Sequence, residues 1–466
     1  MESEIEELRP RSDLFDQRHI MEQVERIKHA ALEAQKKIDY ESAHDPQIIK
    51  SIEVVENFLR KRHRLCYGGQ AINAHLPKAY QFYDPEYSVP DYDFFTPSQK
   101  SDLLLLVKDL RAAGFVEIYV REGMHEGTFK IYVDYVPVAD MTAIDPSLYR
   151  ILSRREYRMN GISYLDANTL RMMMYLELSR PAGEVSRWGK VYERLVLFNE
   201  FAARPPCRIK PMEKHSLSAE QVSFTLSFMV EHQRVFAGAD LISFYDHTLR
   251  TRTKRSKWVL TTKRPLLFYS PTPEEDAELL MKAFHQMEAE AEADADKKGR
   301  KKMRIVSYDS KGVEVLPSMK IIVRGKKPLV FLIRQTACYS YVMFPLDRNR
   351  SLPIASMDTL ITLYFSLGLI RSAYFDMGSM ECVANHVVQL SIQSRDRSGP
   401  FPFISITCQG HQPSVTSLIR KRIQRLTTSK NHIKGLLEGS RSATRKRRGG
   451  GRKETQGDVK RTSQGT

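Results

Sequence analysis

Two acidic residues, Asp91 and Asp93, stand two positions apart in the apolar, strand-forming run Val89–Phe95. Successive side chains of a strand point to opposite faces, so residues i and i+2 share one face. Two carboxylates placed together in this way repel each other unless they are protonated or bound to cations. A pair of Mg²⁺ or Mn²⁺ ions held by such acids is the usual apparatus of phosphoryl and nucleotidyl transfer. Because short acidic pairs are also common on exposed strands and loops, the pair needs support from other residues.

Two further features supply that support. Gly68 and Gly69 follow a predicted strand and precede a predicted helix, where the missing side chains let backbone N–H groups approach a phosphate. A later strand-like run, 130–142, contains Asp140, which could complete a metal site and orient an attacking hydroxyl. Asp134 lies in the same run and is the alternative third carboxylate, because a different strand assignment would exchange the two.

A glycine turn, a D-x-D pair and a later third acid resemble, in this order, the nucleotidyltransferase superfamily that includes DNA polymerase β and the poly(A) polymerases. More specific motifs resemble the poly(A) polymerase catalytic subunit of large nucleocytoplasmic DNA viruses, of the giant-virus and asfarvirus type. These motifs are YGGQAIN at 67–73, PDYDFF at 90–95, HEGT at 125–128, VADMT at 138–142 and YLELSRP at 175–181. The resemblance covers about Arg64 to Asn199, and the remaining chain only by length and general layout.

The resemblance implies a template-independent enzyme that adds adenylates from ATP to RNA 3′ ends and releases pyrophosphate. The residues that would bind two Mg²⁺ or Mn²⁺ ions and carry catalysis are Asp91, Asp93 and Asp140. The residues that would bind the nucleotide are Gly68, Gly69, Ser186, Arg187 and Lys190. The last three lie on a predicted helix, and a plain basic helix face is the alternative interpretation. The alternative functions are another RNA-tailing or oligoadenylate-forming nucleotidyltransferase, and a non-catalytic RNA-binding processivity subunit, which three intact acids argue against.

The composition indicates a globular protein and favours a polyanionic partner. The chain has 466 residues, 42% of them hydrophobic, and a formal net charge of +16, so it can fill globular cores and favours a polyanionic partner. We expect no membrane segment and no secretory signal. The five cysteines are odd in number and widely spaced, which predicts a reducing compartment without a disulfide framework. The resemblance implies the host cytoplasm or the virion, and leaves open a homodimer or, as in poxviruses, a separate partner subunit.

The second half of the chain resembles a diverged duplicate of the first. Four aligned pairs of segments carry this hypothesis: 64–72 with 234–242, 91–98 with 265–272, 135–143 with 329–337, and the helix start at 169–170 with that at 359–360. In this alignment both D-x-D carboxylates become apolar and Arg334 replaces Asp140. Arg334 would then bind phosphate and guide RNA, or be a simple surface cation.

These observations predict an α+β chain with the polymerase β-like nucleotidyltransferase fold, in a tandem of an active and a degenerate domain with helical additions. The expected parts are an N-terminal helical segment (1–45), a catalytic domain (46–204), a degenerate domain (205–438) and a disordered basic tail (439–466). The tail contains Arg445–Arg448, for which an RNA tether is preferred over a nuclear signal or a solubilising end.

Overall fold

The computed structural model describes residues 17–202, 204, 207, 214–251, 262–292, 301–310, 316–346, 349–370, 372–395 and 401–428. The predicted basic tail lies outside the described residues, as does the acidic start of the chain. Within the described part, no helix combines the length and the apolar character needed to cross a membrane.

The first half of the chain builds a mixed sheet with the strand order β3-β4-β5-β2-β1-β7-β6. Its strands are β1 (Leu65–Tyr67), β2 (Tyr92–Thr96), β3 (Ile118–Glu122), β4 (Thr128–Val133), β5 (Val136–Ala143), β6 (Tyr157–Met159) and β7 (Ile162–Tyr164). The helices are α1 (Gln17–Ala43), α2 (Pro46–Arg62), α3 (Gly68–Ala74), α4 (Gln99–Ala112), α5 (Pro146–Ser153), α6 (Ala167–Leu178) and α7 (Trp188–Phe201).

The second half builds another mixed sheet, with the order β10-β11-β12-β9-β8-β14-β13-β15. Its strands are β8 (Val235–Phe236), β9 (Leu266–Ser270), β10 (Met303–Tyr308), β11 (Met319–Arg324), β12 (Lys327–Arg334), β13 (Tyr339–Pro345), β14 (Ser351–Ala355) and β15 (Cys408–Gln409). The helices are α8 (Ala219–Glu231), α9 (Asp240–Thr251), α10 (Pro273–Glu292), α11 (Met357–Leu369) and α12 (Met377–Arg395).

The two sheets share one topology. Adding seven to each strand number of the first sheet reproduces the order of the second, except that β15 extends the second sheet by one strand. The pairing directions also agree, because β1–β7 and β2–β5 are parallel, as are β8–β14 and β9–β12, and the other equivalent pairs are antiparallel. The expected tandem α+β fold is therefore confirmed at the level of topology.

A repeated ion pair fixes the same corner of each sheet. Arg64, just before β1, donates from Nε to Asp102 Oδ2 at 2.6 Å, and Arg234, just before β8, donates from Nε to Asp276 Oδ2 at 2.7 Å. The hydroxyl of Thr96, the last residue of β2, also donates to Asp102. In the second half the hydroxyl of Ser270, the last residue of β9, donates to Asp276 in the same way. Each pair joins the start of one strand to the helix after the next strand, so the duplication extends to side-chain contacts.

The strand register corrects one part of the sequence alignment. Asp93 on β2 pairs with Asp140 on β5, and the equivalent Leu267 on β9 pairs with Phe331 on β12. Arg334 is opposite Ser270 and corresponds to Ala143 in the first sheet. The prediction that Arg334 replaces Asp140 is therefore wrong by three residues.

Arg334 does not lie at the position equivalent to the third acid. It ends β12, its side chain is partly exposed, and its guanidinium forms an ion pair with Glu274 on α10. Its surroundings support the surface-cation alternative.

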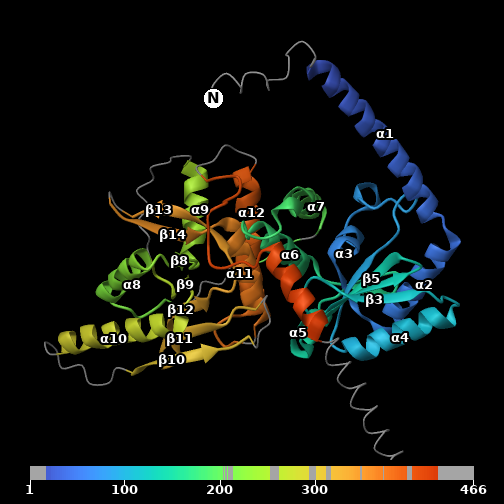
Figure 1. Cartoon of the computed structure of the whole chain (residues 1–466). Coiled ribbons are helices and arrows are strands. Elements are labelled where there is room, and N and C mark those ends of the chain that lie inside the picture. The colour runs from blue at the N-terminus through green and yellow to red at the C-terminus, as the bar shows by residue number, and fades with distance from the viewer. Residues whose placement is uncertain are drawn as a thin grey trace, which may run out of the picture.

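The two lobes meet through the helices that follow each sheet. Figure 1 shows α6 and α11 side by side between the lobes, and these helices pack against each other. Every residue of α11 from Asp358 to Leu369 is buried, because the helix lies between the second sheet and α6. The backbone N–H of Ser340 donates to the carbonyl of Ser179 at 2.8 Å, so main-chain contact also joins the two halves.

Helix starts follow the capping residues in the sequence. Asp45 caps α2 ahead of Pro46, and Asp166 caps α6, each carboxylate accepting from two backbone N–H groups. In α8, Ser218 and Gln221 form a reciprocal capping box. These caps set where each helix enters the sheet layer.

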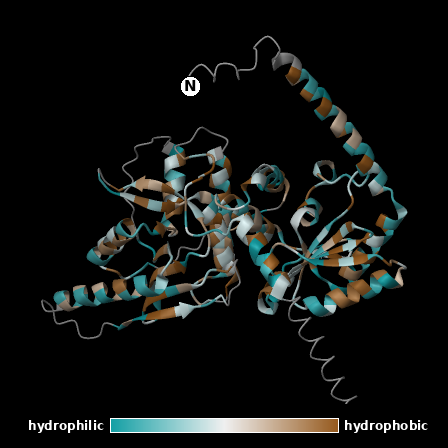
Figure 2. Cartoon of the chain, viewed as in Figure 1, coloured by the Kyte–Doolittle hydropathy of each residue, from teal (hydrophilic) through white to brown (hydrophobic). Residues whose placement is uncertain are grey.

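The first and last helices of the described chain lie differently relative to the first lobe. Helix α1 extends away from the first lobe, and Figure 2 shows hydrophobic and hydrophilic residues mixed along it. Its apolar side chains include Ile27, which is 71% exposed. The helix at 415–428 returns to the first lobe, where Arg425 Nε donates to Glu122 Oε1 at 2.6 Å.

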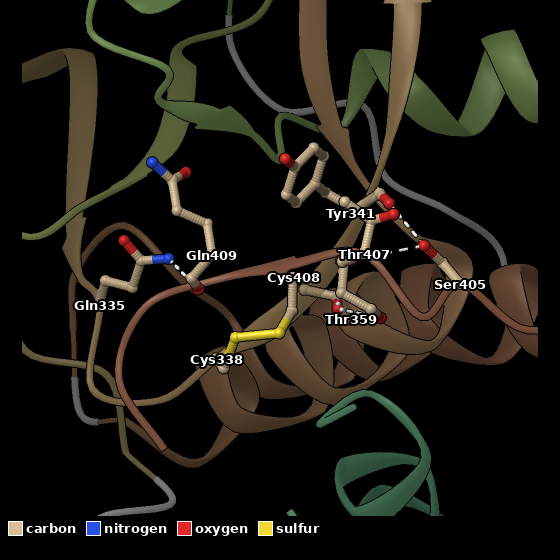
Figure 3. Close-up of a disulfide and its surroundings, with 9 residues drawn as sticks. Gln335, Cys338, Tyr341, Thr359, Ser405, Thr407, Cys408 and Gln409 are labelled. Atoms are coloured by element: carbon tan, nitrogen blue, oxygen red, sulfur yellow. Dashed lines mark hydrogen bonds between the residues drawn. A yellow bond between two sulfur atoms is a disulfide. The ribbon is translucent and has the colours of Figure 1, made fainter. Parts of the chain in front are cut away.

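The expectation of unpaired cysteines is overturned. Two disulfides, Cys207–Cys382 and Cys338–Cys408, join segments that are 175 and 70 residues apart in the sequence, and Cys66 is free and buried. Figure 3 shows Cys338 and Cys408 bonded beside the backbone of Thr407 and Gln409. Sequence spacing did not reveal these pairs because each is made by the folding of distant segments.

Candidate active site

One row of side chains crosses five strands of the first sheet. Directly opposed residues in neighbouring strands point to the same face, so their side chains are neighbours. The row, named here the charged row, consists of Tyr67, Asp93, Asp140, Lys130 and Arg121, on β1, β2, β5, β4 and β3 in that order. It brings two predicted acids together and adds two cations that the motifs did not single out.

The three predicted acids influence one another. Asp140 is buried, Asp93 is partly buried, and Asp91 stands exposed directly before β2. Burial, followed by the charges of Asp91 and Asp140, raises the pKa of Asp93 to about 7. Although Asp91 is exposed to solvent, nearby protein atoms partly desolvate its carboxylate, and this effect, followed by the charge of Asp140, raises the pKa of Asp91. Raised carboxylate pKa values of this kind mark a site where negative charge accumulates without full compensation.

Asp140 uses its two oxygens differently. The ammonium group of Lys130 forms an ion pair with Oδ2 of Asp140. Oδ1 of Asp140 is buried and has no hydrogen-bond partner among the described protein atoms. An ionised oxygen held in this state is costly unless a cation or a donor from another molecule meets it.

Asp134 lies away from this row. It occupies the turn between β4 and β5 with a φ of 47°, and its side chain is exposed. The structure therefore places Asp140, and not Asp134, beside Asp93.

The glycine turn packs directly against the acids. Gly68 has a φ of +70°, and a Cβ atom at this position would overlap the carboxylate of Asp93. A Cβ atom on Gly69 would meet the hydroxyl of Tyr83, which accepts from Arg194 at 3.0 Å. Only a residue without a side chain fits at Gly68 against Asp93 and at Gly69 against Tyr83, so the two glycines let the start of α3 pack closely on these side chains.

Ser186, Arg187 and Lys190 lie on one short exposed stretch. Ser186 and Arg187 belong to the 3₁₀ helix η3 (Val185–Arg187), and Lys190 is in the first turn of α7. Arg187 is 3.6 Å from the carboxylates of both Glu177 and Glu184. Arg187 lies close enough to Asp93 for its positive charge to lower the pKa of that carboxylate.

The acids offer the right donor chemistry for a divalent cation. Carboxylate oxygens are the ligands that Mg²⁺ and Mn²⁺ prefer, and the unpartnered Oδ1 of Asp140 is such a donor. In the described ranges, no three His, Cys, Asp or Glu side chains already stand close enough to cage an ion by themselves. The residues therefore fit a cation that a phosphate would help to hold, which is the usual state of Mg²⁺ beside a nucleotide.

The second sheet shows what the same positions contain without this chemistry. The equivalent row, named here the apolar row, consists of Ala237, Leu267, Phe331, Ile321 and Val306. Phe331 packs against Tyr374 and Phe375, from the segment between α11 and α12 that corresponds to the segment holding Ser186 and Arg187. Aromatic side chains thus fill the space that lies over the acids in the first lobe.

Lys130 and Arg121 were missed by sequence reasoning. Neither belongs to a motif, and a lysine or arginine on a strand is common on exposed surfaces. Their only sequence signal was that Lys130 begins the strand-like run containing Asp140, and the pairing register was needed to place them in the charged row.

Comparisons with known proteins agree with this geometry. Residues 53–184 match the family model described as "Poly(A) polymerase catalytic subunit". A "Putative poly(A) polymerase catalytic subunit" of African swine fever virus (strain Badajoz 1971 Vero-adapted) is 26% identical over 231 residues, which is 49% of this chain and 47% of the relative. A protein of the same description from Acanthamoeba polyphaga mimivirus is 29% identical over 150 residues, 31% of this chain and 25% of the relative.

A solved structure is similar over most of the chain. The Megavirus polyadenylate synthase superposes with a TM-score of 0.67 at 16% identity, covering 88% of this chain and 84% of that one. The sequence matches span about half or less of each viral relative, whereas the fold agrees across both lobes. The resemblance predicted from the motifs of the first half is confirmed.

Proposed function

We propose that this protein is a template-independent poly(A) polymerase, which transfers adenylates from ATP to the 3′ end of RNA and releases pyrophosphate. The observation that carries the proposal is the charged row with Asp91 beside it, since the second sheet has the same topology but an apolar row. A chain that used both lobes only to bind RNA would have no physical need for acids that raise one another's pKa.

In this proposal Asp91, Asp93 and Asp140 hold two divalent cations. Bound there, Mg²⁺ or Mn²⁺ would stabilise the negative charge on the attacking and leaving oxygens of an in-line displacement. Asp140 would also help to take the proton of the RNA 3′-OH, since it lies beside Asp93 in the charged row.

The glycine turn and the exposed basic stretch would hold the triphosphate. Gly68 lies against Asp93 and is only partly buried, whereas Gly69 is buried, so the backbone at Gly68 is the part of the turn that can approach a phosphate beside the acids. Arg187 and Lys190 supply positive charge, and Ser186 a hydroxyl, on the short segment that leads from η3 into α7. Each is exposed and can therefore turn toward a phosphate.

RNA is the proposed acceptor, and the host cytoplasm the proposed place of action. A net charge of +16 gives the chain a sequence-independent attraction for a polyanion. The test is extension of an oligo(A) primer with each ribonucleotide, and tailing with a nucleotide other than ATP would reassign the protein to a sibling activity.

A further inference from the structure

Lys130 is a charged side chain of the row that contacts a predicted acid and has no role in the proposed reaction. It lies on β4 directly opposite Asp140, and its ammonium group binds Oδ2 of that carboxylate. The hydrogen bond and charge of Asp140, with the charge of Asp91, raise the pKa of Lys130 although its partial burial opposes this. Lys130 is therefore a cation drawn into the acid site by two of its three carboxylates.

We infer that Lys130 is the internal counter-ion of the acid site: it neutralises Asp140 while the divalent cations are absent and competes with them for that carboxylate. This inference rests on the proposed function for the identity of the cations, and on the ion pair and register for the role of Lys130. Lys130 is a positioning residue here, since it acts through Asp140 and needs no contact with nucleotide or RNA.

The division of the Asp140 oxygens supports this role. With Oδ2 bound to Lys130, Oδ1 remains buried and unpartnered, so a cation that bound Oδ1 would meet the positive charge of Lys130 across the same carboxylate. Lys130 also lowers the pKa of both Asp91 and Asp93. The ammonium group of Lys130 therefore reduces the repulsion among the three acids, and it contacts one of them directly.

The second sheet supplies an independent comparison within the same chain. Where Asp140 is replaced by Phe331, the position of Lys130 is held by Ile321, which is 2% exposed. A lysine kept only to cover the sheet surface would have no reason to disappear together with the acid. The paired replacement is what a lysine dedicated to the acids predicts.

The test measures Mn²⁺ binding by electron paramagnetic resonance on the full chain without ATP or RNA. The variants are Lys130→Met, which keeps the length but removes the charge, and Lys130→Arg, which keeps the charge. Lys108→Met on α4 is the matched control, because Lys108 is exposed and outside the row. Measurement at pH 8.5 limits competition from protons, since the pKa of Asp93 is about 7.

We expect Lys130→Met to bind Mn²⁺ at least about tenfold more tightly than wild type, since a competing unit charge a few ångströms away has been removed. Its melting temperature in EDTA should fall, and the rise on adding Mn²⁺ should be larger than for wild type. Lys130→Arg and Lys108→Met should bind Mn²⁺ as wild type does. Unchanged or weaker Mn²⁺ binding by a folded Lys130→Met protein would overturn the inference.

A double-mutant cycle separates this role from a general effect of charge. In an Asp140→Asn background, Lys130→Met should change Mn²⁺ affinity by less than about twofold, because the carboxylate through which Lys130 acts is gone. The same tightening in both backgrounds would contradict the inference. No outcome depends on adenylate transfer, so failure of the proposed function and failure of this inference are distinguishable.

Discussion

Asp140 and Phe331 hold equivalent positions in two sheets of the same strand order. Asp140 lies directly opposite Asp93, and Phe331 lies directly opposite Leu267. The first is a buried carboxylate with one oxygen unpartnered, and the second is packed among aromatic rings. The fold alone therefore does not demand acids at this position. The second lobe keeps the strand order with an aromatic residue at this position, so the acids of the first lobe are not required by the scaffold.

Gly68→Ala should strongly reduce primer extension while leaving a folded protein. The new Cβ would overlap the carboxylate of Asp93 and would also be strained at a φ of +70°. Gly127→Ala is the matched control, because its φ is +79° but its Cβ would only touch Ala143 at an ordinary 3.6 Å.

We expect Gly127→Ala to lose about 1 kcal/mol of stability or somewhat more from backbone strain, and to keep its activity. Gly68→Ala should lose about 100-fold or more in kcat/KM, the size of effect that displaced catalytic groups produce. Equal activity of the two variants would mean that the turn does not pack on the acid strand as described.

The metal-free protein should become less stable as pH rises toward 7 because of Asp93. Its pKa is about 7 in the folded chain and near 4 in an unfolded one, so the folded state binds the proton more tightly between these values. Stability gained from that proton is present at low pH and is lost as pH rises through 7.

Urea unfolding in EDTA at pH 5.5, 6.5 and 7.5 measures this effect. The free energy of unfolding of wild type should fall relative to that of Asp93→Asn across the series, since the variant cannot ionise at this position. Parallel pH profiles for the two proteins would show that Asp93 has an ordinary pKa.

Arg187→Ala should weaken use of the nucleotide more than it weakens the fold. The side chain is exposed, and it lowers the pKa of Asp93, so it lies near the acids without being part of the core. We expect the KM for ATP to rise by about tenfold, as for loss of one charged contact to a phosphate, with the melting temperature unchanged. Arg158→Ala, which removes a similarly exposed arginine paired with Glu156, is the control and should leave KM unaffected.

The disulfide between Cys338 and Cys408 should contribute to the stability of the second lobe. It closes 70 residues of chain, and it holds β15 beside β13. Cys408→Ser should lower the free energy of unfolding by about 2–4 kcal/mol. Peptide mapping without reduction should find only Cys66 alkylated after denaturation, whereas alkylation of all five cysteines would contradict both disulfides.

The sequence was sufficient for the acid pair, the glycine turn and the duplication, because each has a local signature. Asp91 and Asp93 are recognisable because they stand two positions apart in an apolar run. The alignment of Arg64 with Arg234 is confirmed by their matching ion pairs. The choice between Asp134 and Asp140 needed more, since both lie in one apolar run and only the turn at Asp134 separates them.

Two features could not be read from the chain for physical reasons. The error that aligned Arg334 with Asp140 arose because β5 and β12 share an apolar pattern but almost no residue identities, and an apolar pattern does not fix strand register. Lys130 became significant only through its cross-strand partner, which is a property of pairing and not of local sequence. Register is a tertiary property, and it decided both questions.

The most direct test of the central claim is extension of a labelled oligo(A) primer by the full chain, with each of the four ribonucleotides and either Mg²⁺ or Mn²⁺. Wild type is compared with Asp91→Ala/Asp93→Ala, and with Leu267→Ala as a control in the equivalent strand of the second lobe. The account predicts long tails from ATP alone, lost in the double variant and retained in any folded Leu267→Ala protein. Primer binding without extension by wild type would contradict the account and favour a non-catalytic RNA-binding subunit.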